Sequence, residues 1–312
     1  MLRYLLRRIV YAVPILIGVS LVTFVVFYAT VSPATMARQV LGPKATQQQI
    51  KEWVVQRGYD RPRSEQFRKH MSELLLLKFG KSDTTEQDIW TNIRQRAPVS
   101  AAIGSIMFVG GVVTAICFSL AVAYFRGTYI DYWGTFLCVL LMSVVYVVYV
   151  IAGQFLLGKV LRYFPLAGFQ PGAGMWKFTL LPAVIGIISG LGASVRFYRT
   201  LLLEEMNQDY VRTARAKGVS EKRVLFRHVL KNASISILTS TVLAIPFLIT
   251  GSLVLESFFA IPGLGTLTVD AINASDFATV RAMVFLGAIL YIIGAILTDV
   301  SYTLVDPRLR LE

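Results

Sequence analysis

The sequence predicts an all-α, polytopic membrane protein with about six transmembrane helices. Of its 312 residues 55% are hydrophobic and only 16% are charged, whereas soluble domains carry nearer a quarter charged residues. A span needs about 20 apolar residues, and lipid leaves a non-helical backbone without hydrogen-bond partners. Runs without Asp, Glu, Lys or Arg cover 9–30, 97–125, 132–158, 178–195, 232–255 and 282–298.

The first apolar run has a second interpretation, as a cleaved secretory signal. Arg3, Arg7 and Arg8 precede it, as basic residues precede the apolar region of a signal. The run is too long for such a region, and no clean small-x-small cleavage site follows it. We therefore expect a retained transmembrane helix over residues 1–31.

The distribution of Lys and Arg predicts the orientation in the membrane. Nine basic residues lie between Arg196 and Lys231, whereas the short loops expected outside hold only four. This asymmetry places both termini in the cytoplasm. The net charge of +13 then needs no nucleic-acid partner, because topology and anionic lipid headgroups account for it.

Residues 32–96 form a connection too long for a plain loop and predict a small helical insertion on the periplasmic side. Thr46 to Gln49 has the form of a capping box, and Gly58 is a plausible helix stop. A second helix is expected from near Ser64 towards Gly80. A third is expected over 88–96, leading into the membrane at Pro98.

The segment 204–232 is basic and is expected to lie in the cytoplasm. Asn207 or Asp209 can cap a short helix over 210–217, and Gly218 can end it in a left-handed conformation. Ser220 can then cap a second helix. The residues alone leave two interpretations open: a docking helix for a protein partner, or a basic amphipathic loop on anionic lipid.

Ordered motifs along the whole chain resemble one family of transport proteins. They are Arg212-Thr213-Ala214-x-x-x-Gly218, Leu181-Pro182-Ala183, Glu256-x-x-Phe259-x-Ile261-Pro262-Gly263-Leu264-Gly265 and Asp306-Pro307-Arg308. In this set the chain resembles the binding-protein-dependent ABC permeases, specifically the first membrane subunit of oligopeptide, dipeptide and nickel importers.

This resemblance implies a type I ABC importer permease. Residues 97–304 would be its five-helix core, with the cytoplasmic coupling loop 204–232 and a cytoplasmic tail at 305–312. It also implies four kinds of partner: a second homologous permease subunit, two ATP-binding subunits, a soluble or lipid-anchored substrate-binding protein, and membrane lipids. ATP and Mg would bind to the partner ATPases and no cofactor to this chain.

The same resemblance assigns roles within the coupling loop. Gly218 would set the turn, Ala214 and Ala216 would enter a groove of the ATPase, and Arg212, Arg215 and Glu221 would contact its rim. The full set of expected coupling residues is Tyr210, Val211, Arg212, Thr213, Ala214, Arg215, Ala216, Lys217, Gly218 and Glu221.

The chain also departs from the family pattern near the expected translocation path. Ser143-Val144-Val145-Tyr146 replaces a Ser-x-Pro-x-aromatic stretch in the third span, and Ser236 stands where a proline usually enters the fifth. The candidate path residues are Ser143, Tyr146, Ser236 and Thr239. These departures leave the substrate open among dipeptides, oligopeptides, glutathione, nickel chelates and antimicrobial peptides.

The sequence is less consistent with two other functional classes. An ion-coupled secondary transporter is the main alternative, but Glu256 and Asp299 lie at the ends of spans and predict hydrogen-bonded boundary acids rather than a proton relay. An enzyme is disfavoured because the sequence lacks a nucleophile motif or a paired metal motif. The stretch Gly153-x-x-x-x-Gly158-Lys159-Val160 imitates a phosphate-binding loop but lacks its Ser or Thr and ends an apolar span.

Overall fold

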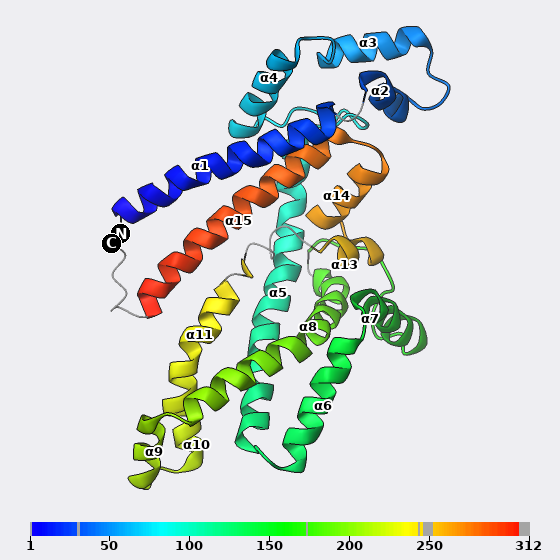
Figure 1. The fold of residues 1–312 in the computed structure, drawn as a ribbon. Helices are drawn as coiled ribbons and strands as arrows, with labels where there is room; N and C mark the ends of the chain where they lie inside the picture. The colour runs from blue at the N-terminus through cyan, green and yellow to red at the C-terminus, as the bar shows by residue number, and fades with distance from the viewer. Residues whose placement is uncertain (1, 30–31, 173, 243, 246–251, 306–312) are drawn as a thin grey trace.

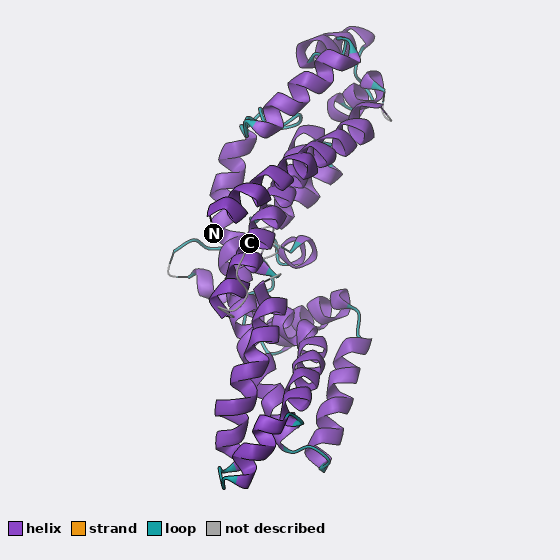
Figure 2. Cartoon of the chain, turned by 60° about the vertical axis from the view of Figure 1, so that its left-hand side comes forward, coloured by secondary structure: helices purple, strands orange, loops and turns teal. Residues whose placement is uncertain are grey.

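The computed structural model describes residues 2–29, 32–172, 174–242, 244–245 and 252–305. Within these ranges the chain is built from helices and has no strand, apart from an isolated bridge between Lys81 and Asp88 (Figure 2). The predicted all-α class is confirmed for this part of the chain.

Four helices of the described chain contain segments long and apolar enough to cross a membrane. They are α1 (Leu2–Phe24, continued by the π-helical turn η1, Val25–Ala29), α5 (Ile89–Tyr124), α8 (Met175–Met206) and α15 (Phe277–Val305). A fifth span results if two helices that meet at a 94° bend count together: α6 (Tyr129–Ser143) and α7 (Tyr146–Gly153, continued by η2, Gln154–Val160). These spans match five of the six expected apolar runs.

The remaining expected span, 232–255, is described only in part. α11 (Leu230–Val242) covers its beginning, and α13 (Leu253–Phe258) begins near its end. Residues 243 and 246–251, including Pro246, lie outside the described residues, as does the tail from 306 onwards with its Asp306-Pro307-Arg308 motif. The short helix α14 (Leu264–Asn273) connects α13 to α15.

The long helices pack lengthwise, with α5 and α6 against α8 and with α1 along α15 (Figure 1). Small residues permit the closest approaches. A Cβ at Gly192 of α8 would stand 2.5 Å from the Cys138 carbonyl oxygen of α6. At the α1–α15 contact, Arg8 pairs with Asp299 at 2.8 Å. Asp299 therefore bonds to a neighbouring helix, as expected of a boundary acid.

The insertion forms three helices: α2 (Pro33–Leu41), α3 (Gln47–Arg57) and α4 (Arg63–Leu75). The capping box at Thr46 and Gln49 is present, and Gly58 ends α3 with φ 74°, so both predictions are confirmed. The expected third helix over 88–96 is not separate. Asp88 caps α5, accepting the Thr91 backbone N–H at 2.8 Å, and α5 runs unbroken through Pro98.

The insertion is fastened to the start of α15 by a buried polar network. Asp276 accepts hydrogen bonds from the Asp83 backbone N–H at 3.0 Å, from the Ser82 hydroxyl, and from the backbone N–H and hydroxyl of Thr279. Asp83 in turn accepts the Ala278 backbone N–H at 2.9 Å. Residues about 195 positions apart in the chain are thereby held together.

Candidate functional site

The expected coupling segment lies between α8 and α11. It consists of α9 (Asp209–Ala216), α10 (Glu221–Arg223) and the π-helical turn η3 (Val224–Val229). Figure 1 shows α9 and α10 at the opposite end of the molecule from α2, α3 and α4. A compact helix is thus presented at one end of the helix bundle.

Local geometry confirms the end of the predicted helix and corrects its beginning. The N-cap of α9 is Gln208, with extended backbone angles, and Asp209 is already helical. Asn207 instead closes α8, since its N–H bonds to the Glu204 and Glu205 carbonyls. Gly218 has φ 75° and its N–H bonds to the Arg215 carbonyl at 2.9 Å, so the predicted left-handed turn is confirmed. Ser220 occupies the predicted N-cap position of α10, but its side chain makes no capping hydrogen bond there.

The helix α9 has one buried and one exposed face. Val211 and Ala214 are buried, at 0% and 7% exposure, in an apolar cluster with Leu202, Val224 and other residues of α8 and η3. Of the two alanines expected to enter a partner's groove, Ala214 is covered by the chain's own core and Ala216 is exposed. The other eight of the ten expected coupling residues are exposed: Tyr210, Arg212, Thr213, Arg215, Ala216, Lys217, Gly218 and Glu221.

Polar contacts hold the exposed face in place. Arg215 and Glu221 form a two-pronged ion pair across the Gly218 turn, with N–O distances of 2.7 and 3.3 Å. The Tyr210 hydroxyl donates to Glu205 at the end of α8, and burial raises the pKa of that phenol. The helix α9 is thus held at both ends, while Arg212 and Lys217 remain exposed.

A partly buried ion pair joins two helices at the same end of the bundle. Arg199 of α8 donates from Nε to Asp131 Oδ1 at 3.0 Å and from Nη2 to Oδ2 at 2.9 Å. Asp131, on the first turn of α6, also accepts the Gly127 backbone N–H at 3.0 Å. The pair joins α6 to the helix that leads directly into the coupling segment. Sequence reasoning missed this pair, because its partners are 68 residues apart.

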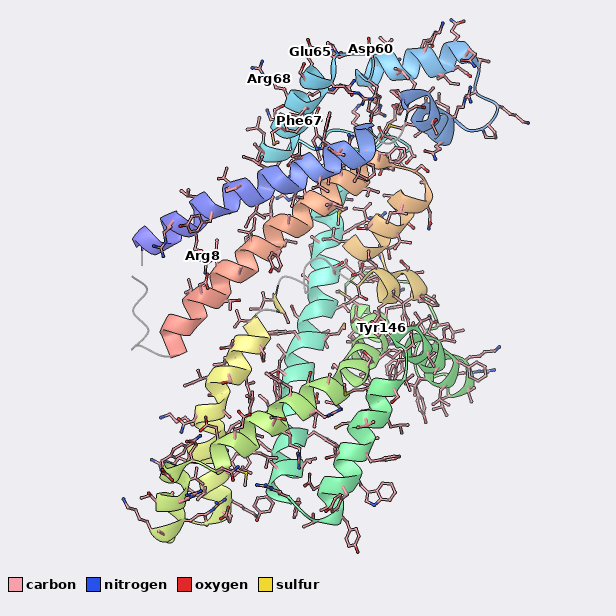
Figure 3. The ribbon with its side chains drawn as sticks, viewed as in Figure 1. Arg8, Asp60, Glu65, Phe67, Arg68 and Tyr146 are labelled. Atoms are coloured by element: carbon pink, nitrogen blue, oxygen red, sulfur yellow. The ribbon has the colours of Figure 1, made fainter. Side chains whose placement is uncertain are left out.

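Two candidate path residues flank the 94° bend between α6 and α7. Ser143 is the last residue of α6 and Tyr146, labelled in Figure 3, is the first of α7. Their neighbours Val144 and Val145 have extended backbone angles. The Tyr149 hydroxyl donates to the Leu141 carbonyl at 2.7 Å, which satisfies one of the carbonyls that the helix end leaves unpaired.

The other two candidates, Ser236 and Thr239, lie on an exposed face of α11. The Thr239 hydroxyl donates back to the Ile235 carbonyl at 2.9 Å. The structure therefore does not gather all four candidates around one internal cavity. Two mark a break between helices, and two face outward from a helix that a second subunit could cover.

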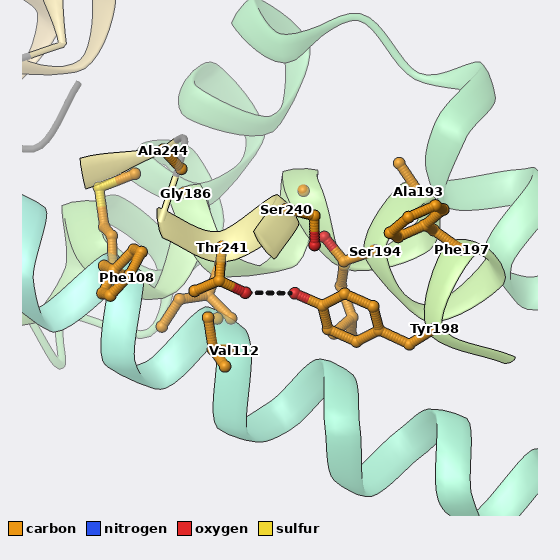
Figure 4. A pocket seen from close by; sticks show the side chains of 15 residues that line it. Phe108, Val112, Gly186, Ala193, Ser194, Phe197, Tyr198, Ser240, Thr241 and Ala244 are labelled. Atoms are coloured by element: carbon orange, nitrogen blue, oxygen red, sulfur yellow. Dashed lines mark hydrogen bonds between the residues drawn. The ribbon is translucent and has the colours of Figure 1, made fainter. Parts of the chain in front are cut away.

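A cavity of about 410 Å³ lies instead between α5, α8 and α11 (Figure 4). Glycine at position 186 leaves space at its wall, because a Cβ there would stand 2.2 Å from the end of the Met107 side chain. Its polar groups are hydroxyls, and Figure 4 shows the Tyr198 hydroxyl directed at that of Thr241, at an O–O distance of 3.2 Å. Sequence reasoning missed these residues, since only the packing of three helices brings them together.

Glu256 has a structural role. It is 1% exposed, and its Oε2 accepts the Gly265 N–H at 2.7 Å and the Thr266 N–H at 3.3 Å, at the start of α14. A Cβ at Gly263 would stand 2.2 Å from this carboxylate. In the Glu256–Gly265 motif, the carboxylate of Glu256 therefore caps the start of α14, and the glycine at 263 leaves room for it. This is the role expected of a hydrogen-bonded boundary acid.

A bundle of long apolar helices, broken at a bend and carrying an exposed basic helix at one end, defines a polytopic membrane transport protein. Comparison with known proteins agrees. The model of the family described as binding-protein-dependent transport system inner membrane component matches residues 115–311, and that of its N-terminal region matches 1–104. The chain belongs to this family and is a permease component of a binding-protein-dependent transport system.

Relatives match this chain over nearly its whole length at about 30% identity. The dipeptide transport system permease protein DppB of Lactococcus lactis is 32% identical and covers 100% of both chains. The glutathione transport system permease protein GsiC of Salmonella paratyphi A is 32% identical over 99% of both. The oligopeptide transport system permease protein AppB of Bacillus subtilis is 29% identical over 99% of this chain. Family membership favours this transport class over the ion-coupled secondary carrier.

Proposed function

We propose that this chain forms half of the translocation path of an ATP-driven importer for short peptides or similar small solutes. A second homologous permease subunit would supply the other half, and two ATP-binding subunits would hydrolyse ATP. A binding protein would deliver the substrate. The observation that carries this proposal is α9, an exposed helix with basic side chains that is fixed to the bundle core through Val211 and Ala214.

Because α9 is packed against the bundle core, a displacement of α9 would be transmitted to the translocation path. The helix shares its apolar cluster with α8 and with η3, which continues into α11. α8 and α11 also form walls of the cavity of about 410 Å³. A displacement of α9 by closing ATPases would therefore move two helices that border the interior, because a close-packed core transmits strain.

The orientation follows from the same assignment. α9 and both termini would face the cytoplasm, and the insertion would face the periplasm, where it meets the binding protein. The excess of Lys and Arg in 196–231 over the short outer loops supports this orientation.

The substrate class rests on the relatives, whose names specify dipeptides, oligopeptides and glutathione. The hydroxyls of the exposed Ser236 and the half-buried Thr239, on a helix that also carries Ser234 and Ser240, suit a polar path completed by a second subunit. If these two positions only contacted lipid, apolar residues would serve there equally well.

Uptake in proteoliposomes tests the proposal. The complete complex, with its binding protein, should import a radiolabelled tripeptide only when ATP is present, and dissipating the proton and sodium gradients should leave uptake intact. Uptake that persists after ATPase inactivation but stops with the ion gradient would overturn it.

A further inference from the structure

A second cavity, of about 290 Å³, lies between the insertion and the start of α15. Its walls come from the end of α3, from α4, from residues 79–83, and from Ala278 and Arg281 of α15. It shares no lining residue with the cavity between α5, α8 and α11. Pockets for drug-sized ligands begin near about 300 Å³, so this cavity suits a smaller molecule.

Charged side chains of both signs line this cavity. Four are basic, namely Arg57, Lys69, Lys81 and Arg281, and two are acidic, namely Glu73 and Asp83. With both acids ionised the lining carries a formal excess of two positive charges. A concave site with charge of one sign in excess concentrates oppositely charged groups, because its low-dielectric walls focus the field.

The two acids differ in how firmly they are held. Asp83 is 5% exposed, pairs with Arg57 at 3.1 Å and accepts the Ala278 N–H at 2.9 Å, so it belongs to the frame of the cavity. The Glu73 side chain is 38% exposed, and its contact with Lys69 on the same helix spans 3.8 Å. A surface pair of this kind is worth only about 0.3–0.5 kcal/mol, and the more distant Arg281 also attracts the Glu73 carboxylate, so a ligand ammonium group would add to these contacts.

Gln66 adds a buried acceptor to the wall. Its Nε2 donates to the Tyr59 carbonyl at 3.0 Å and to the Arg61 carbonyl at 2.7 Å, which fixes the orientation of the amide. Its Oε1 is shielded from bulk solvent and accepts no hydrogen bond from the described residues.

We propose that this cavity binds an amino-acid-sized zwitterion, with Glu73 receiving its ammonium group and Lys81 and Arg281 receiving its carboxylate. A ligand with only a negative charge would leave Glu73 without a partner. A ligand with only a positive charge would be repelled by the excess of basic side chains. The site is separate from the translocation path and does not depend on the function proposed above. A ligand here bridges the insertion and α15, so it would strengthen their contact.

Equilibrium binding of radiolabelled L-alanine to the assembled complex in nanodiscs tests this proposal. L-Alanine should bind saturably, and acetate or ethylammonium should displace it only at about tenfold higher concentration, because each makes half of the charged contacts. Binding of L-alanyl-L-alanine, measured in the same way, shows whether the natural ligand is a free amino acid or the end of a peptide. Either compound, bound with the residue dependence described next, supports the site.

Matched variants locate the binding. Glu73→Gln and Lys81→Gln should each raise the Kd for L-alanine about fivefold or more, since each removes a charged hydrogen-bond partner. Glu65→Gln on the same helix, labelled in Figure 3, and Lys51→Gln on α3 change exposed charges outside the cavity and should leave the Kd unchanged. Peptide uptake by all four variants reports that they fold.

Two results would overturn the proposal. One is the absence of saturable binding of either compound to the wild-type complex. The other is saturable binding that Glu73→Gln and Lys81→Gln leave unaltered, because the ligand would then occupy a different site.

Discussion

Replacing Gly218 by valine should uncouple ATP hydrolysis from the permease. Gly218 ends α9 with φ 75°, a conformation that costs L-residues about 1–2 kcal/mol and β-branched residues more. A Cβ at this position would meet no atom within 4 Å, so backbone strain alone acts. A penalty of that size reduces the population of the native turn about fivefold to thirtyfold.

The turn positions both ends of the Arg215–Glu221 clamp, so its loss would disorder the exposed face of α9. The assay is peptide-stimulated ATP hydrolysis by the complex in nanodiscs. Gly218→Val should reduce the stimulation about fivefold or more without changing basal hydrolysis. Gly218→Asn is the matched control, because asparagine tolerates the left-handed region, and it should keep most of the stimulation. Wild-type stimulation in Gly218→Val, or equal losses in both variants, would refute the reasoning.

Three further predictions concern other contacts. Arg199→Met leaves the Asp131 carboxylate buried without its cation and should destabilise the complex by about 3–5 kcal/mol, measured as lost thermal stability that Arg199→Lys partly restores. Asp276→Ala removes the acceptor of two hydrogen bonds from the insertion, those of the Ser82 hydroxyl and the Asp83 N–H, and should weaken insertion docking by about 3 kcal/mol, seen as faster tryptic cleavage at Lys81; unchanged cleavage would contradict this. Burial, together with the Arg281 charge, lowers the pKa of His70 to about 4, below its value in the unfolded chain. The folded state therefore keeps its full stability above about pH 6.5 and loses stability as the pH falls, by about 2 kcal/mol at pH 5. His70→Gln should reduce this difference between melting curves at pH 7.5 and pH 5, and an unaltered difference would exclude His70 as its source.

Local signals in the sequence predicted several elements correctly because their causes are local. The Thr46–Gln49 box, the Gly58 stop and the Gly218 turn each depend on one or two side chains within a few residues. The apolar runs likewise predicted where the long helices lie, because membrane insertion depends on composition over about 20 residues.

Other features had no readable local signal. The bend between α6 and α7 occurs at Val144 and Val145, without glycine or proline. β-Branched residues favour the extended angles found there, but the same residues also occupy membrane helices. Gln208 occupies the N-cap position of α9 without a side-chain capping bond, although Asn207 and Asp209 are better capping residues, because α8 continues to Met206 and ends at Asn207.

The helix α9 was predicted in position, but not the direction in which its side chains face. The sequence shows that 208–218 is short, basic and helical, yet the burial of Ala214 depends on Leu202 and Val224 from neighbouring elements. The hydroxyl-lined cavity similarly requires α5, α8 and α11 to meet. Contacts between distant segments are set by packing, which periodicity alone does not specify.

The most direct test of the proposed coupling is cysteine cross-linking from α9 to the partner ATPase. Cys117 and Cys138 are first replaced by alanine, and one cysteine is placed at the exposed Ala216 or at the buried Ala214. Ala216→Cys should cross-link to the ATPase in membranes, with a yield that changes on adding ATP, while Ala214→Cys should not. If Ala216→Cys reacts with maleimide but never cross-links to an ATPase present in the same membranes, then α9 is not the coupling helix.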